Sequence, residues 1–367
     1  MSELFASAKR LTAPQRKKAA QQIEDLARVE QLLLGLVQRG LRALDTMDLA
    51  DVRAQSKRMI DGDLRGVSQE LLRFGAAIEA AKSDDRAMHH AVAQTTRLWT
   101  LVRRGLRLLR AHVAGETSPE KHALWLETRL GRALRVSELE SLGSVLRDRL
   151  LYELAHTRFS DAVIATRTHQ SWLVDVHSGE VFLRWSSLPK SALRSAGASL
   201  HGPLESMIRL PQLALHDSPL CNRRVRFTES DEGIEFAPRG REQTAQIHAH
   251  AQSIAQAHSA LCGQLRDGLA PGSAVFLLAL ERAGIAPNGD LAVVDREQRP
   301  LRIARRYASV STHENARLVA SRVESAKHAA MLARVWVDPA THTLRCEPLA
   351  LLLDDEHLRL EPPTWLL

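Results

Sequence analysis

The sequence predicts an α+β protein with an N-terminal helical domain followed by a strand-rich C-terminal part. Within the first 143 residues, apolar side chains recur at steps of three and four, which is typical of amphipathic helices. After Gly143 this pattern gives way to short apolar runs separated by turns. A chain of 367 residues also exceeds what one hydrophobic core usually organises. We therefore expect a helical domain at 1–143, a β-rich domain at 144–240 and a mixed α/β domain at 241–367.

The helical domain is expected to contain five or six antiparallel elements. Its first helix spans residues 14–44, and Pro14 after Thr12 is typical of a helix start with Thr12 as N-cap. Helices at 49–60, 64–81 and 83–115 follow. The segment from Ser118 opens another, because Pro119 is favoured at a first helical position.

The strand-rich part begins with apolar runs of strand length. Strands are expected at 150–159, 162–168, 171–175, 181–185, 207–215 and 223–227, and a turn with Gly179 joins the third and fourth as a hairpin. A helix at 241–267, strands at 291–294 and 301–303, a helix at 314–332 and strands at 334–337 and 343–346 complete the chain. No internal repeat stands out.

The net charge of +7 is unevenly distributed along the chain. Nearly all of the excess lies in residues 1–143, which carry 24 Lys and Arg against 18 Asp and Glu. Attraction to an anionic partner should therefore begin in the helical domain. The chain also has 42 arginines against 8 lysines, and a biased genome composition is an alternative explanation for that excess.

Several sequence patterns that indicate a membrane or secreted protein are absent. No apolar run approaches the roughly 18–20 residues that span a bilayer. The basic cluster at 16–18 is followed by polar residues, where a signal peptide needs an apolar core. The three cysteines lie far apart, which indicates neither a disulfide framework nor a zinc site with paired cysteines. We expect a cytoplasmic protein without a membrane partner.

Three segments carry a resemblance to a known family. They are EQLLLGLVQRGL at 30–41, KRMIDGDLRG at 57–66 and SWLVD at 171–175. They resemble the region that follows the zinc finger in bacterial SWIM zinc-finger family proteins, over about residues 20–230. The CxC and CxH of the finger are absent, so no metal ligand is carried over. The resemblance implies an interaction protein that works with a MoxR-type AAA ATPase and a von Willebrand A-domain protein.

The helix expected at 83–115 separates apolar from basic side chains. At 100° per residue its apolar residues fall in one arc, and a second arc carries Arg103, Arg104, Arg107 and Arg110, with Arg97 near its edge. We call these five residues the arginine stripe. No acidic residue lies between Arg97 and Arg110. Guanidinium groups bind phosphate in a two-pronged manner, so the stripe predicts a nucleic-acid or anion site. The alternative is an ion-paired helix face, with carboxylates such as Glu127 or Glu138 supplied by a neighbouring helix.

Other groupings of reactive residues have simpler explanations. Asp295 and Glu297 resemble a nuclease pattern but lie at an expected hairpin tip. The helix with His248, His250 and His258 offers at most two zinc ligands. Aspartates between 45 and 63 fit helix caps and turns. The common nucleotide, dinucleotide, serine-hydrolase and zincin motifs are absent. We therefore expect no catalytic residue, no metal ligand and no cofactor.

The sequence favours a binding protein over an enzyme. The leading hypothesis is a non-catalytic scaffold or adaptor subunit of a bacterial multiprotein system, which follows from the missing catalytic motifs and from the family resemblance. The alternative is a nucleic-acid binding protein that uses the arginine stripe. The identity of the partner, the oligomeric state and a site assembled from distant residues are left open by the sequence.

Overall fold

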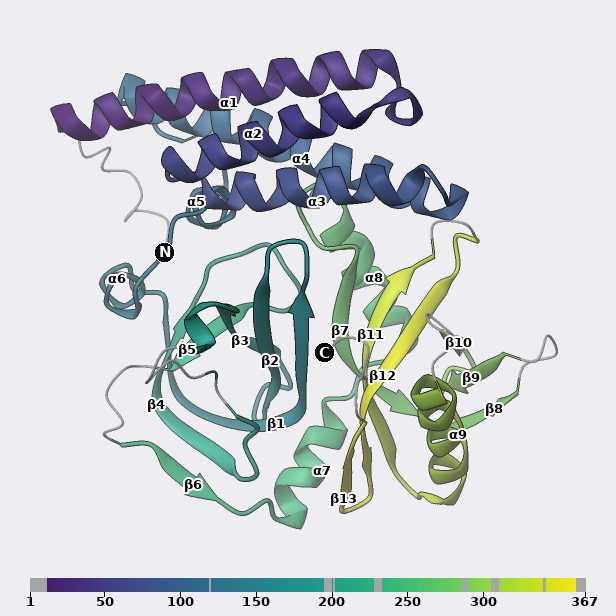
Figure 1. Ribbon diagram of the computed structural model, residues 1–367. Coiled ribbons are helices and arrows are strands. Elements are labelled where there is room, and N and C mark those ends of the chain that lie inside the picture. Colours follow the sequence, from purple (N-terminus) through teal and green to yellow (C-terminus); the bar gives the residue numbers. More distant parts are fainter. Residues whose placement is uncertain are drawn as a thin grey trace. The chain divides into compact units, whose positions relative to one another are not determined.

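The structure is a computed structural model that describes residues 12–118, 120–194, 200, 202–227, 233–285, 290–304, 310–338 and 341–360. The chain forms two compact units, Met1–Glu138 and Leu139–Leu367. The first unit is helical and the second consists mainly of strands, as Figure 1 shows, so the predicted α+β class is confirmed. The proposed division of the second part near residue 240 stays a prediction. Within the described residues, no helix has the length and apolar character needed to cross a membrane.

Long helices build the first unit (Figure 1). They are α1 (Ala13–Arg39), α2 (Thr46–Asp61), α3 (Arg65–Ala81) and α4 (Asp85–Ala114), joined by a 3₁₀ turn η1 at Leu41–Ala43 and the short helix α5 (Ala123–Leu130). Thr12 forms the capping box of α1 with Gln15. The helix expected at 14–44 ends at Arg39, because Gly40 adopts a φ of +86° that few other residues tolerate. Pro119 lies outside the described residues.

The core of this unit is aliphatic, with one buried phenylalanine. Its fully buried members come from all four long helices: Leu26, Leu33, Leu36, Met59, Leu71, Phe74, Ile78, Leu98 and Leu101. Their recurrence at three- and four-residue steps is the pattern that predicts the helices. A short helix, α6 (Val136–Ser141), runs across the boundary between the two units in the chain.

Replacing Gly66 by alanine should destabilise the helical unit by about 1–3 kcal/mol, because α3 and α5 approach too closely there for a side chain. A Cβ atom at Gly66 would lie 1.9 Å from the backbone oxygen of Arg129. Gly35 in α1 is the matched control, since a Cβ there meets nothing within 4 Å. Gly35→Ala should stabilise the helix by about 0.5–1 kcal/mol. Urea unfolding measures both changes, and effects of the same sign would contradict this account.

The second unit begins with a closed barrel. Its strands are β1 (Val145–Asp161), β2 (Thr166–Asp175), β3 (Val181–Pro189), β4 (Met207–Leu215) and β5 (Arg224–Phe227), and β6 (Glu235–Ala237) adds to β4. The long β1 pairs with β4 through its first half and with β2 through its second half. An irregularity between Glu153 and Ala155 lies on the β2 side of this strand. Because β3 runs parallel to β5 and β5 pairs with β4, the barrel closes in the order β1-β2-β3-β5-β4.

A second barrel follows with the same topology. Its elements are β7 (Ser273–Leu280), β8 (Arg282–Ile285), β9 (Leu291–Val294), β10 (Pro300–Ile303), α9 (Val310–Ser325), β11 (Ala329–Val337), β12 (Leu344–Leu353) and β13 (Glu356–Arg359). Only Glu281 separates β7 from β8, so together they act as one long first strand that pairs with β11 and with β9. The third strand, β10, is parallel to the fifth, β12, as β3 is to β5.

Both barrels therefore have the strand order and pairing of the OB-fold, a five-stranded Greek-key barrel. In the second barrel, α9 connects the third strand to the fourth and packs Ala316, Val319 and Val323 into the core. The first barrel has the 3₁₀ turn η2 (Ala192–Arg194) within this connection. The outer faces of the barrels share an apolar layer that includes Trp172 and Leu332.

Besides the helix expected at 14–44, four of the predicted elements are wrong in extent. The separate strands expected at 150–159 and 162–168 belong to one hairpin of β1 and β2, whose turn contains Ala165 at a φ of +50°. The helix expected at 314–332 gives way to β11 at Ala329. The helix expected at 241–267 is two helices, α7 (Arg241–Ala249) and α8 (Ile254–Leu265).

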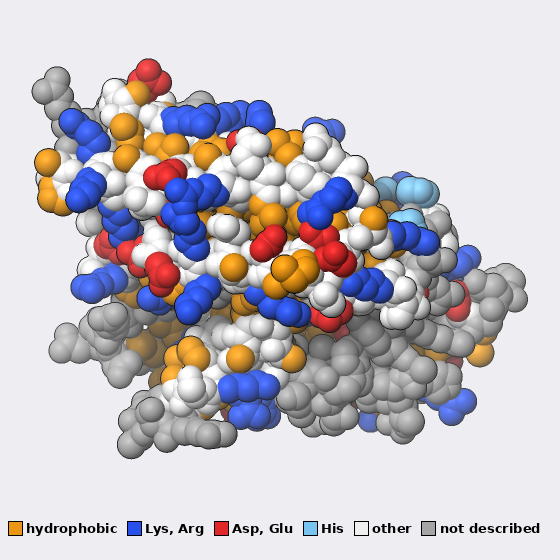
Figure 2. Space-filling view, turned by 45° about the horizontal axis from the view of Figure 1, so that its top comes forward, with side chains coloured by type: hydrophobic (Ala, Val, Ile, Leu, Met, Phe, Trp, Pro, Cys, Tyr) orange, Lys and Arg blue, Asp and Glu red, His pale blue; other side chains and the backbone are white. Residues whose placement is uncertain are grey.

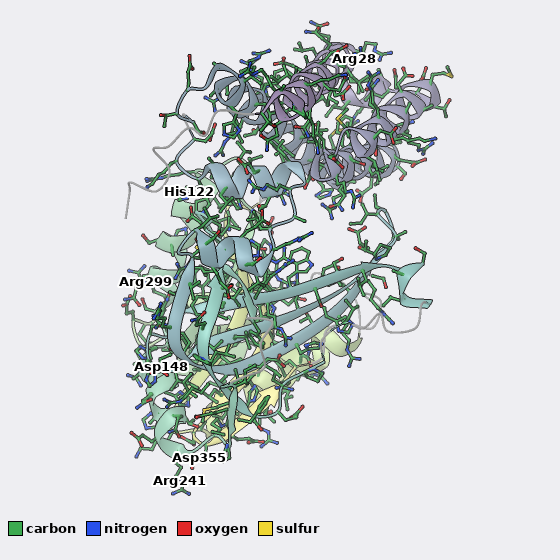
Figure 3. The ribbon with its side chains drawn as sticks, turned by 90° about the vertical axis from the view of Figure 1, so that its left-hand side faces the viewer. Arg28, His122, Asp148, Arg241, Arg299 and Asp355 are labelled. Carbon is green, nitrogen blue, oxygen red and sulfur yellow. The ribbon has the colours of Figure 1, made fainter. Side chains whose placement is uncertain are left out.

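The break between α7 and α8 has a long-range cause. Gln252 forms a bridge to Leu278 of β7, which pulls the backbone out of the helix. Ser253 then caps α8 in a capping box with Gln256, and the buried carboxylate of Asp295 accepts the backbone N–H of Ile254 at 2.8 Å. Arg241 of α7 pairs with Asp355 at 2.9 Å, at the turn between β12 and β13 (Figure 3).

Candidate functional site

The five arginines of the stripe all lie on helix α4, but they lie in three different environments. The opposite face of the helix is buried in the unit, with Leu98, Val102 and Leu106 at 2% exposure or less, so the predicted apolar arc is the packed one. Arg97 is half-buried and lies in the field of Glu70, whereas Arg103, Arg107 and Arg110 are exposed and Arg104 is half-buried between them. The structure therefore does not bring all five arginines to one place.

Three of the arginines line a surface pocket of about 450 Å³, which we call the arginine pocket. Its lining residues are Trp99, Thr100, Arg103, Arg104 and Arg107. The guanidinium carbon of Arg103 lies 5.8 Å from the centre of the Trp99 ring, within cation–π range. The spacing of four residues between Trp99 and Arg103 places both on one helix face, a signal that sequence reasoning overlooked.

Carboxylates from outside α4 partly neutralise this pocket. Glu30 of α1 pairs with Arg103 at 2.9 Å. Glu120 pairs with Arg104 at 2.7 Å and with Arg107 at 2.9 Å. In these ion pairs, three guanidinium groups meet two carboxylates.

The ion pairs at the pocket differ in burial. The side chain of Glu120 is 7% exposed and that of Arg104 is 16% exposed, so this pair is held inside the protein. The side chains of Arg103 and Arg107 are 60% and 61% exposed. Their guanidinium groups face solvent and can reach a ligand, while Arg104 fixes the position of Glu120.

The two carboxylates expected to pair with the arginine stripe pair with a different arginine. Glu127 and Glu138 both bind Arg132. Arg110 makes no ion pair among the described residues and adds one more exposed cation to the same helix, one turn beyond Arg107. Figure 2 shows the wider pattern, in which Lys and Arg side chains lie among Asp and Glu over the helices.

Arg97 belongs to a buried polar cluster instead of the pocket. Glu70 of α3 is 3% exposed and accepts hydrogen bonds from Arg129 at 2.8 Å and Arg73 at 3.3 Å, and from Gln94 of α4. Burial opposes ionisation of Glu70, but the fields of Arg129 and Arg73 outweigh it and lower the pKa of the carboxyl. This cluster joins α3, α4 and α5, so its role is structural.

The remaining reactive groupings hold the fold together. Asp295 is 1% exposed, and its carboxylate also accepts the backbone N–H groups of Glu297 and Arg299, which explains the D-x-E pattern as a capped turn. Asp45 caps α2. Within the described part of the chain, no group of three His, Cys, Asp or Glu side chains is placed to hold a metal ion.

Comparison with known proteins adds little to this geometry. No family model matches the chain, and no curated protein sequence matches it. Among solved structures, a chain of a replication protein A heterotrimer bound to ssDNA is similar over 62% of this chain and 68% of that chain, at 10% identity. The TM-score of 0.17 is too low to support any argument about fold or function.

Proposed function

We propose that the chain binds a polyanion, with single-stranded nucleic acid as the ligand class, at the arginine pocket of α4. The observation that carries this proposal is the placement of two exposed guanidinium groups, Arg103 and Arg107, beside Trp99 in one pocket. Guanidinium groups bind phosphate in planar, two-pronged fashion, and tryptophan offers a face for stacking bases. The pocket thus combines the two kinds of contact that single strands need.

The ion pairs at the pocket are compatible with this function. The side chain of Glu30 is only 16% exposed whereas that of Arg103 is 60% exposed, so a phosphate would bind Arg103 from the solvent side while Glu30 keeps its ion pair. The buried Glu120 keeps Arg104 in place while Arg107 turns towards the ligand. The two OB-type barrels of the second unit support the same class by analogy of fold, since such barrels often bind oligonucleotides.

Removing both exposed charges of the pocket should weaken binding of a labelled dT20 oligonucleotide at least tenfold. In the full chain, Arg103→Gln/Arg107→Gln removes two phosphate contacts, which should reduce the slope of log affinity against log salt by about 1.4. Glutamine is preferred to glutamate, because a carboxylate at position 107 would face Glu120. Fluorescence anisotropy at several salt concentrations measures both quantities.

The matched control is Arg28→Gln/Arg53→Gln. These arginines belong to the same unit and also make exposed ion pairs, with Glu24 and Glu79, so the change in net charge is identical. This variant should keep its affinity within about twofold. Equal losses in the two variants would show binding by net charge alone, and no loss in either would exclude the pocket.

The adaptor function implied by the family resemblance stays a prediction and is the second candidate. Leu34 and Val37 favour it, because they are 37% and 49% exposed and lie three residues apart on α1. We expect recovery of the tagged chain from its host with an AAA ATPase and a von Willebrand A-domain protein, in the cytoplasm. Recovery of the chain alone at low salt would count against this candidate.

A further inference from the structure

Three buried hydrogen-bonding atoms on the first barrel have no partner within the described residues. They are Nε2 of His216, Oγ of Ser218 and Nε of Arg224. Buried polar atoms in folded proteins are nearly always satisfied, and an exception often marks a site for an ion or water. These three lie on one short stretch, from the end of β4 to the start of β5, which points to a common partner.

The strand pairing places two of these side chains opposite each other. The backbone N–H of His216 donates to the carbonyl of Arg224 at 2.9 Å, directly beyond the pair Leu215 and Val225. Because Leu215 and Val225 are in the barrel core, alternation along the strands puts His216 and Arg224 on the outer side. His216 is 8% exposed, so its ring is nevertheless covered.

An exposed tryptophan and a second arginine adjoin this pair. Arg226 is two residues beyond Arg224 on β5 and so shares its face of the barrel. The guanidinium carbon of Arg224 lies 5.9 Å from the centre of the Trp185 ring, and its Nη2 donates to the Trp185 carbonyl. Trp185 is 36% exposed, which leaves part of its ring open to a ligand.

Arg226 acts on both Arg224 and His216 through its charge. Arg224 makes no ion pair within the described part of the chain, and burial followed by the field of Arg226 lowers the pKa of its guanidinium to about 10. Burial, then Arg224 and Arg226, lower the pKa of His216 to about 4, so its ring is neutral near pH 7. A neutral ring can still donate through Nε2–H, and an added anion would attract the guanidinium group of Arg224.

We propose that His216, Ser218, Arg224 and Arg226 form a second anion site, the barrel anion site, which binds a phosphate group of single-stranded nucleic acid while a neighbouring base stacks on Trp185. The ligand class rests on the proposed function, but the location rests on its own observations. The hydroxyl of Ser218, the Nε–H of Arg224 and the Nε2–H of His216 are all donors, which suits an acceptor-only phosphate.

Binding of a labelled dT20 oligonucleotide to the full chain tests this site. Arg224→Gln/Arg226→Gln should weaken binding at least tenfold and reduce the salt slope by about 1.4. Trp185→Ala should weaken it by about five- to a hundredfold through lost stacking. Arg147→Gln is the control, since Arg147 is an exposed arginine of β1 in the same barrel that makes no ion pair among the described residues. That variant should stay within about twofold of the wild type.

Each outcome decides for or against the barrel anion site. Unchanged affinity in the double variant and in Trp185→Ala overturns it, and Trp185→Ala alone decides if the double variant does not fold. Competition by millimolar inorganic phosphate, with no effect of Trp185→Ala, would indicate a site for free phosphate and overturn the nucleic-acid assignment. If the arginine pocket variant binds normally while the barrel variants do not, the proposed pocket fails and the barrel anion site stands.

Discussion

Replacing Glu70 by leucine should lower the free energy of unfolding of the helical unit by about 3–5 kcal/mol, because it leaves buried charges without their partner. Glu70 is 3% exposed and accepts hydrogen bonds from two arginines, Arg73 and Arg129. The side chains of these arginines are each only 32% exposed, so water replaces the lost carboxylate poorly. Gln94 of α4 loses its acceptor in the same substitution.

Urea unfolding with a control on the same helix measures this effect. Glu79 of α3 also pairs with an arginine, but its side chain is 63% exposed and the N···O distance to Arg53 is 3.7 Å. Glu79→Leu should change the free energy of unfolding by no more than about 0.5 kcal/mol. A loss of similar size in the two variants would contradict the account, since burial is what separates them.

The pH dependence of the Glu70 contribution has a definite sign. Although burial alone would raise the pKa of Glu70, the arginines lower it below the ordinary value of 4.5, so the folded state holds fewer protons than the unfolded state. The stabilisation is therefore present above about pH 4.5 and is lost as the pH falls further. Glu70→Gln should make the free energy of unfolding of the helical unit depend less on pH in this acid range.

The helices and several strands could be predicted because their periodicity is local. The observed bounds of β4 and β9 coincide with the predicted strands at 207–215 and 291–294. The helix break before Ile254 has a local signal in the capping box of Ser253 and Gln256, but the bridge from Gln252 to Leu278 and the contact with Asp295, 41 residues away, could not be predicted. A pattern within one helix contains no information about such distant partners.

The candidate site shows the same limit. The arrangement of arginines along one face of α4 follows from helical spacing, and the structure has Arg103, Arg104 and Arg107 side by side at the pocket. Their partners Glu30 and Glu120 belong to other segments, and nothing in the sequence distinguishes them from Glu127 or Glu138. The repetition of the barrel was also hidden, because a closed five-stranded topology requires only alternating apolar residues and leaves their identity free.

Acidification from pH 6.5 to 4 should unfold the second unit, since three of its histidines are held neutral in the folded state. Burial is the main cause in each case, and it lowers the pKa of His156, His216 and His357 to about 4. The unfolded chain binds protons at these rings near pH 6.5, so stability is present above that pH and is lost as the pH falls towards 4. Each shift corresponds to roughly 3 kcal/mol at most.

Together these losses are comparable with the total stability of a typical domain, about 5–15 kcal/mol. Glu153 acts in the opposite direction, because burial raises the pKa of its carboxyl and its protonation in acid stabilises the fold. The stabilisation from protonating this one carboxyl group is smaller than the loss from protonating three histidines. Calorimetric melting temperatures at constant ionic strength, measured from pH 8 to 4, should therefore fall steeply below about pH 6.5.

Substitution of His357 tests this loss of stability in acid most directly. Its Nε2–H donates to the carbonyl of Leu154 at 2.8 Å, so its Nδ1 accepts the hydroxyl of Tyr152 at 2.6 Å and must stay unprotonated for that bond. His357→Gln removes one titrating ring and should shrink the loss of stability between pH 6.5 and 4 by about a third. His258→Gln, at an exposed position of α8, should leave the curve unchanged. Parallel curves for His357→Gln and the wild type would show that this ring does not drive the acid transition.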